Sequence, residues 1–176
     1  MKKATSIICL ACLLIVSCTS KKNVLSKEDA FQKIQQGKQF PKVIEYDLYC
    51  GDPQQAKKVV DAGLETDGLL KVQRTQKLRE VGSPLIHLTD KAQAYLLPTP
   101  EKDKSSNIQK VKLGEEQLVE VTGITTSESG KDAVVEYTTA YKDLTPFSVL
   151  VATDYKQIAS RKANFSLDNE GWKLEK

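Results

Sequence analysis

The residue types that most often carry out chemistry in proteins are few and scattered in this chain. Cysteines stand at positions 9, 12, 18 and 50, and His87 is the single histidine among 176 residues. A transition-metal site needs several such ligands at close spacing. Alternation along 86–88 places His87 on the polar face of a predicted strand, and the chain has neither a GxSxG nor an HExxH motif. The sequence therefore predicts a protein that is not an enzyme, with no catalytic, cofactor-binding or metal-binding residue.

Cys18 differs from the other cysteines because it ends an apolar segment at the N-terminus. Lys2 and Lys3 precede a run of 11 uncharged residues, 7–17, which is typical of an export signal. A membrane span needs roughly 20 apolar residues, so this run is too short to cross a bilayer. A core helix at the start of the chain is the other interpretation, but it would have to tolerate the flanking lysines.

The four residues Ile15-Val16-Ser17-Cys18 resemble the lipobox of bacterial lipoproteins. This resemblance implies that residues 1–17 are a signal peptide, that cleavage precedes Cys18, and that a diacylglycerol on its sulfur anchors the chain through a tether of residues 18–25. Thr19, rather than an aspartate, implies the periplasmic face of the outer membrane if the organism has one. Cys9 and Cys12 leave with the signal peptide, so Cys50 is the remaining free thiol. Alternation points Cys50 inward.

Residues 26–97 are predicted to form a small α+β lobe. Ser26 and Asp52 are N-cap residues for two helices, and a strand lies between these helices. Two further strands follow around a basic turn with Arg74, Lys77 and Arg79, and Thr89 begins a short helix. The strands are predicted at 43–50, 69–76 and 85–88. The second half of this αβαββα order resembles the wing of winged-helix domains, although export excludes nucleic acid as a partner.

Residues 98–107 contain only polar and proline side chains and are predicted to be a linker or a surface loop. Beyond them, in 108–176, apolar residues recur at every second position in several short strands around 111–113, 118–124, 133–141, 163–167 and 172–174. Residues 147–158 have helical spacing, with an extended alternative at Val149 and Val151. The expected second lobe is an antiparallel sheet packed on one helix, and the fold class of the whole chain is α+β.

Residues 18–176 as a whole resemble small bacterial envelope lipoproteins of unassigned function, which share a wing-like first half and a closing glycine-tryptophan hairpin, here Gly171-Trp172. The prediction is a non-catalytic, membrane-anchored periplasmic protein that acts through protein or envelope contacts, with an envelope protein as partner. In the alternative, the curved C-terminal sheet binds a small apolar or amphipathic ligand. The aromatic residues that would line such a pocket, or fill a core, are Tyr137, Tyr141, Phe165 and Trp172.

Overall fold

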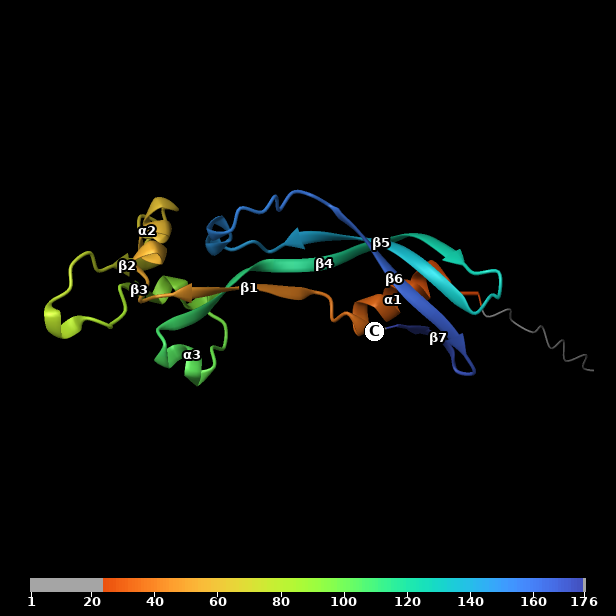
Figure 1. Cartoon of the computed structure of the whole chain (residues 1–176). Coiled ribbons are helices and arrows are strands. Elements are labelled where there is room, and N and C mark those ends of the chain that lie inside the picture. Colours follow the sequence, from red (N-terminus) through yellow and green to blue (C-terminus); the bar gives the residue numbers. More distant parts are fainter. Residues whose placement is uncertain (1–23, 176) are drawn as a thin grey trace, which may run out of the picture.

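The computed structural model describes residues 24–175 and shows an elongated α+β protein (Figure 1). The predicted signal peptide and the predicted lipidation residue Cys18 lie outside the described residues. In chain order the elements are α1 (Lys27–Gly37), β1 (Lys42–Tyr49), α2 (Pro53–Asp61), β2 (Leu70–Val72), η1 (Leu78–Glu80), β3 (Ile86–Leu88), η2 (Asp90–Tyr95), α3 (Glu101–Ser105), β4 (Ile108–Thr126), β5 (Asp132–Lys142), η3 (Pro146–Leu150), β6 (Ala159–Asp168) and β7 (Gly171–Leu174).

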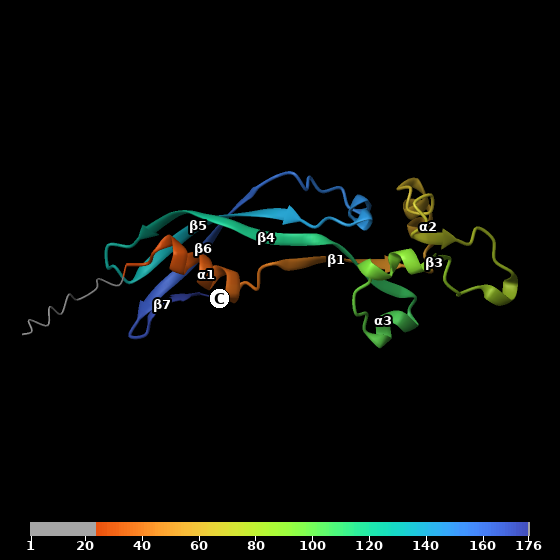
Figure 2. The same ribbon diagram turned by 180° about the vertical axis from the view of Figure 1, so that it is seen from behind.

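Five antiparallel strands form the main sheet in the spatial order β1-β4-β5-β6-β7, and β2 pairs with β3 in a separate hairpin. β4 is 19 residues long and pairs with β1 along its first part and with β5 along its second part. Irregular pairing near Leu113 changes the face on which its side chains lie. Lys112 and Glu115 would point to opposite faces of a regular strand, yet their side chains form an ion pair at 2.6 Å. β4 runs from the end of the molecule where it pairs with β1 to the end where it pairs with β5 (Figure 2).

The first hydrophobic core lies at the end of the molecule that contains α2, β2 and β3. It combines α2 and the hairpin with parts of β1 and β4 and with η3, which is far away in the sequence. Its buried residues are Leu48, Cys50, Ala56, Val59, Leu64, Leu69, Leu70, Ile86, Ala92, Val111, Leu113, Phe147 and Leu150. We call β2, β3 and the loop 73–85 between them the wing, and this end of the molecule the wing end.

The second core lies at the opposite end, where α1 covers one face of the main sheet. Ser26 caps α1 as predicted, since its hydroxyl accepts a hydrogen bond from the backbone N–H of Asp29 at 3.0 Å. The buried residues of this core are Leu25, Ala30, Ile34, Phe40, Val121, Ala133, Val135, Tyr137, Ala163, Phe165 and Trp172. Leu25, predicted as the last residue of the tether, is therefore part of this core.

The two cores do not divide at the predicted linker 98–107. α1 precedes the linker but packs on strands that follow it, while η3 follows the linker but belongs to the core that contains α2. The predicted winged-helix-like lobe 26–97 therefore lacks its first helix, which lies in the other core. The helix that the sheet of 108–176 packs on is α1 and not residues 147–158.

Two local predictions are also wrong. The segment 98–107 is folded, because Thr99 is buried and its hydroxyl accepts hydrogen bonds from the Lys110 backbone at 2.9 Å and the Gln109 side chain at 2.8 Å. The helix expected at 147–158 is limited to the short η3, and Val151 is already extended. This matches the extended alternative for that residue.

Candidate docking site

Helix α2 begins at Pro53 because the residues at its N-terminus meet the hydrogen-bonding needs of its first turn. Asp52 accepts a hydrogen bond from the Gln54 N–H at 2.9 Å, and Pro53 occupies the first helical position, where its missing N–H costs nothing. The side chain of Gln55 accepts a hydrogen bond from the Tyr46 hydroxyl at 2.9 Å. This contact ties α2 to β1 and fixes the helix face that turns toward the wing.

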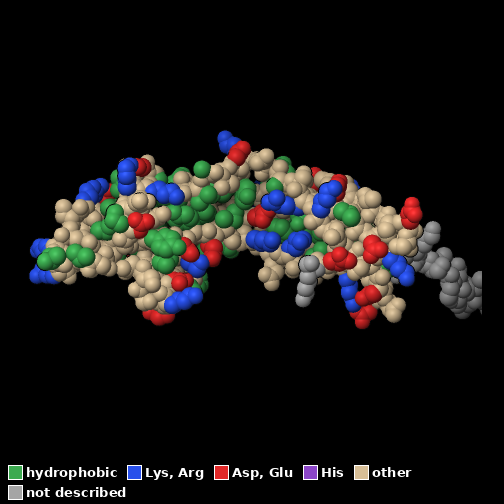
Figure 3. Space-filling view, in the orientation of Figure 1, with side chains coloured by type: hydrophobic (Ala, Val, Ile, Leu, Met, Phe, Trp, Pro, Cys, Tyr) green, Lys and Arg blue, Asp and Glu red, His purple; other side chains and the backbone are tan. Residues whose placement is uncertain are grey.

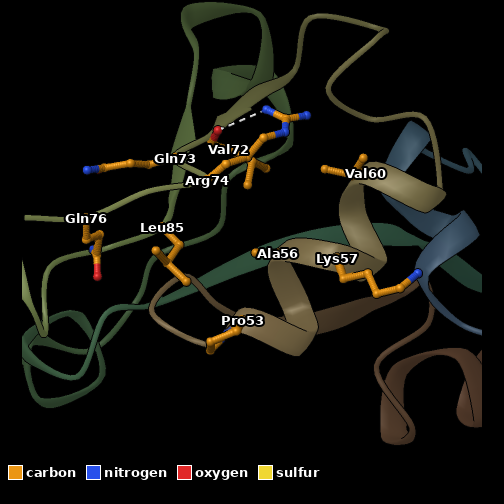
Figure 4. A pocket seen from close by; sticks show the side chains of 9 residues that line it. All are labelled: Pro53, Ala56, Lys57, Val60, Val72, Gln73, Arg74, Gln76 and Leu85. Atoms are coloured by element: carbon orange, nitrogen blue, oxygen red, sulfur yellow. Dashed lines mark hydrogen bonds between the residues drawn. The ribbon is translucent and has the colours of Figure 1, made fainter.

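A groove of about 470 Å³ lies between α2 and the wing, and we call it the α2–wing groove (Figure 4). Apolar side chains of α2 face those of the wing across it, while glutamines and cations stand along its mouth. Its lining residues are Pro53, Ala56, Lys57, Val60, Val72, Gln73, Arg74, Gln76 and Leu85. An apolar groove with a few polar groups at its edge is the usual form of a binding site for a side chain or a small ligand.

The guanidinium of Arg74 is already engaged at the edge of the groove. It donates to both carboxylate oxygens of Glu65, at 2.5 and 3.3 Å, and to the Val72 carbonyl at 3.2 Å. The Glu65 carboxylate also accepts a hydrogen bond from the Val72 N–H at 2.9 Å. The bonds from Arg74, and after them the bond from Val72, lower the pKa of Glu65 below its ordinary value, while Glu65 raises the pKa of Arg74. Arg74 therefore fixes the wing to the loop after α2 rather than offering a free positive charge.

The wing loop is held in shape by its own hydrogen bonds. The Glu80 carboxylate accepts from the Lys77 backbone at 3.1 Å and from the Gln73 side chain at 3.2 Å. The Gln76 side chain donates to the Ser83 carbonyl at 3.0 Å. This network shapes a short projection at Lys77–Val81, which we call the wing tip.

The wing tip exposes two large apolar side chains. Leu78 is 92% exposed and Val81 is 70% exposed. Figure 3 shows hydrophobic side chains at this end of the molecule with Lys and Arg side chains beside them. The sequence prediction identified the basic residues of this turn but overlooked the two apolar ones. Their presence in a turn otherwise made of polar residues and glycine was the signal that could have found them.

The four predicted aromatic residues are not brought together in one cavity. Tyr137, Phe165 and Trp172 are buried in the second core, and the Tyr137 ring packs edge-to-face on Phe40 at 6.5 Å between centroids. Tyr141 lies farther along β5 and packs edge-to-face on Tyr155 at 5.2 Å. Three of the four therefore fill the core against α1, which was the second of the two predicted roles.

His87 and Cys50 both lie where strand alternation placed them, one on the polar face and one inward. His87 is exposed on β3. Cys50 is 7% exposed, and burial raises the pKa of its thiol to about 11. The thiolate is the reactive form of cysteine, so this thiol is poorly suited to nucleophilic chemistry.

We expect Cys50 to react slowly with a thiol reagent in the native protein. At pH 8 a pKa of about 11 leaves about 100-fold less thiolate than a pKa of about 9, and burial slows the reaction further. The measurement is the rate of modification in the chain from residue 18 onward with Cys18→Ser, in buffer and in denaturant. Equal rates in the two conditions would show that Cys50 is accessible in the folded state.

Within residues 24–175 no helix is long and apolar enough to cross a membrane. The same part of the chain holds no group of three or more His, Cys, Asp or Glu side chains placed to bind a metal ion. In comparisons with known proteins, no family model, curated protein or solved structure matches the chain.

Proposed function

We propose that this protein is a non-catalytic lipoprotein, anchored through a lipid on Cys18 to the periplasmic face of the outer membrane, and that it works by contact. Its contact surface is the wing end, where the α2–wing groove takes an apolar segment of an envelope protein. The observation that carries this proposal is the groove itself, in which apolar side chains of α2 lie opposite those of the wing.

The filled second core supports contact at the wing end rather than ligand binding by the sheet. A pocket among the aromatic residues of the sheet would need space beside Tyr137, Phe165 and Trp172, but α1 packs there. The groove offers instead the side chains of Ala56 and Val60 opposite Val72 and Leu85. Such a surface binds through an apolar anchor residue surrounded by polar contacts.

The position of the groove also supports this proposal. Residue 24, where the described chain begins, lies at the end of the molecule opposite the wing end (Figures 1 and 2). A lipid anchor a few residues before it would hold the α1 end near the membrane and leave the groove at the far end of the protein. In this arrangement the length of the molecule separates the lipid anchor from the α2–wing groove.

The proposal is tested by photo-crosslinking in intact cells that express the full chain. A photo-reactive residue in place of Gln76, at the mouth of the groove, is expected to give one protein adduct of defined mass. Val60→Lys should reduce this adduct at least about tenfold, because a charged side chain then occupies the groove and is well tolerated near a helix C-terminus. Adduct yield on a denaturing gel is the measurement.

The matched control carries the photo-reactive residue at Ile158, which is exposed but lies away from the wing. It should not give the same adduct. Cys18→Ser in the same cells should move the protein from the membrane fraction to the soluble fraction or leave it unprocessed. Equal adducts at both positions, or an adduct indifferent to Val60→Lys, would contradict docking in the groove; unchanged acylation of the Cys18→Ser chain would contradict the anchor.

A further inference from the structure

The wing carries more cations than acids, and only part of this positive charge is paired within the fold. Between residues 71 and 82 the chain has four cations, Lys71, Arg74, Lys77 and Arg79, and one acid, Glu80. Arg74 is paired with Glu65, and Arg79 forms an ion pair at 3.9 Å with Glu80, whose carboxylate also accepts from the Lys77 backbone. Among the ion pairs of the described residues none includes Lys71 or Lys77.

The apolar side chains of the wing tip lie on a projection and not in a hollow. In Figures 1 and 2 the loop between β2 and β3 extends beyond the rest of the molecule, and η1 lies at its outer end. Leu78 is the first residue of η1 and Val81 follows its last residue. The hydrogen bonds of Glu80 and Gln76 maintain this shape, so the exposure of both side chains belongs to the folded state.

We propose that the wing tip binds an anionic phospholipid surface. Leu78 and Val81 enter the region between headgroups and acyl chains, while Lys77 and Arg79 lie beside the lipid phosphates. Moving the two apolar side chains out of water lowers the free energy. The negative charge of the lipid phosphates attracts the two cations. This inference goes beyond docking in the α2–wing groove and does not depend on it.

Charge and shape together favour a lipid surface over a protein partner for this projection. A bilayer accepts a convex tip without a matching pocket, and cations on both sides of Leu78 suit a continuous layer of negative charge. The groove lies beside the tip and has a different lining, with Lys57 paired to Asp61 and Arg74 to Glu65. The tip and the groove can therefore be altered separately.

The test measures binding to vesicles by sedimentation. The protein is the chain from residue 18 onward with Cys18→Ser, which keeps every described residue and cannot bind through its lipid. We expect it to sediment with vesicles of phosphatidylglycerol and phosphatidylcholine in equal amounts and to remain in solution with phosphatidylcholine alone. Binding should weaken at high salt, because salt screens the attraction between exposed charges.

Variants assign the binding to the wing tip. Leu78→Asp is expected to weaken vesicle binding at least about tenfold, and so is the pair Lys77→Gln and Arg79→Gln. The matched control is Ile158→Asp, which places the same acid at another exposed apolar position and should leave binding unchanged. Circular dichroism of each variant verifies that the fold is retained.

Several outcomes would overturn the inference. These are no sedimentation with the anionic vesicles, equal binding to both vesicle types, and equal loss in Leu78→Asp and Ile158→Asp. A protein adduct from a photo-reactive residue at Leu78, without vesicle binding, would assign the tip to a protein partner. Val60→Lys should not weaken vesicle binding, because it adds a cation and leaves the wing tip intact, so failure at the groove and failure at the tip are distinguishable.

Discussion

Phe147→Ala is expected to lower the free energy of unfolding by about 3–5 kcal/mol, the usual range for removing a buried phenyl ring. Phe147 is fully buried in the first core, and its ring packs edge-to-face on Tyr95 at 6.1 Å between centroids. The substitution leaves a cavity between η3 and the elements of the wing end. Denaturant unfolding followed by the fluorescence of Trp172 gives the free energy of each variant.

The matched control is Val149→Ala, on the same short helix but 59% exposed. It should change the free energy of unfolding by less than about 0.5 kcal/mol, as surface substitutions usually do. A change below about 1 kcal/mol for Phe147→Ala would mean that η3 does not form part of the first core. Binding at the α2–wing groove should fall with Phe147→Ala if the wing end loses its packing.

Ile34→Ala is expected to cost about 2–5 kcal/mol, the range for truncating a buried isoleucine to alanine. Ile34 is fully buried on α1, where it packs in the second core with residues that lie after position 120 in the sequence. Its removal weakens the attachment of α1 to the sheet. The same denaturant titration measures this effect, and Gln35→Ala, an exposed change on the same helix, is the control.

The two substitutions together test whether the cores unfold as one unit. If they do, each variant shifts a single transition, and the double variant loses about the sum of the two free energies. Two separate transitions, each sensitive to one substitution, would show that the wing end and the α1 end unfold independently. The long strand β4 favours the first result, because it supplies Val111 and Leu113 to one core and Val121 to the other.

Local structure followed from the sequence where a short segment determines it. Ser26 and Asp52 are N-cap residues because their side-chain oxygens accept from the first turn of the helix that follows directly. Alternation placed Cys50 inward and His87 outward because neighbouring side chains in a strand point to opposite faces. The α+β class also followed, since both periodicities occur in one chain of this length.

Longer-range structure did not follow, and β4 shows why. The sequence predicted separate strands at 111–113 and 118–124, between which stand Gly114 and three polar residues. The structure has one strand, with pairing irregularities beside Leu113, between Leu118 and Glu120, and between Val121 and Gly123. A stretch without apolar alternation is read as the end of a strand, although bulges interrupt the alternation within a continuous strand in the same way.

The candidate site could be predicted only in part. The basic turn with Arg74, Lys77 and Arg79 was recognised, but the pairing of Arg74 with Glu65 depends on how the loop after α2 meets the wing. The α2–wing groove depends on the same packing, to which η3 contributes from the other side of residues 98–107. Sequence periodicity describes the faces of single elements and does not specify which faces meet.

The arrangement of β1 and β4 has a mechanical consequence. Both strands run along the long axis of the molecule and are antiparallel neighbours from Lys42 to Tyr49 (Figure 1). With one end held at a membrane and the other by a bound partner, tension acts along these strands and not across them. The hydrogen bonds between them are then loaded together in shear rather than opened one after another. Under the proposed function, this ladder would resist a pull along the long axis better than one loaded across its strands.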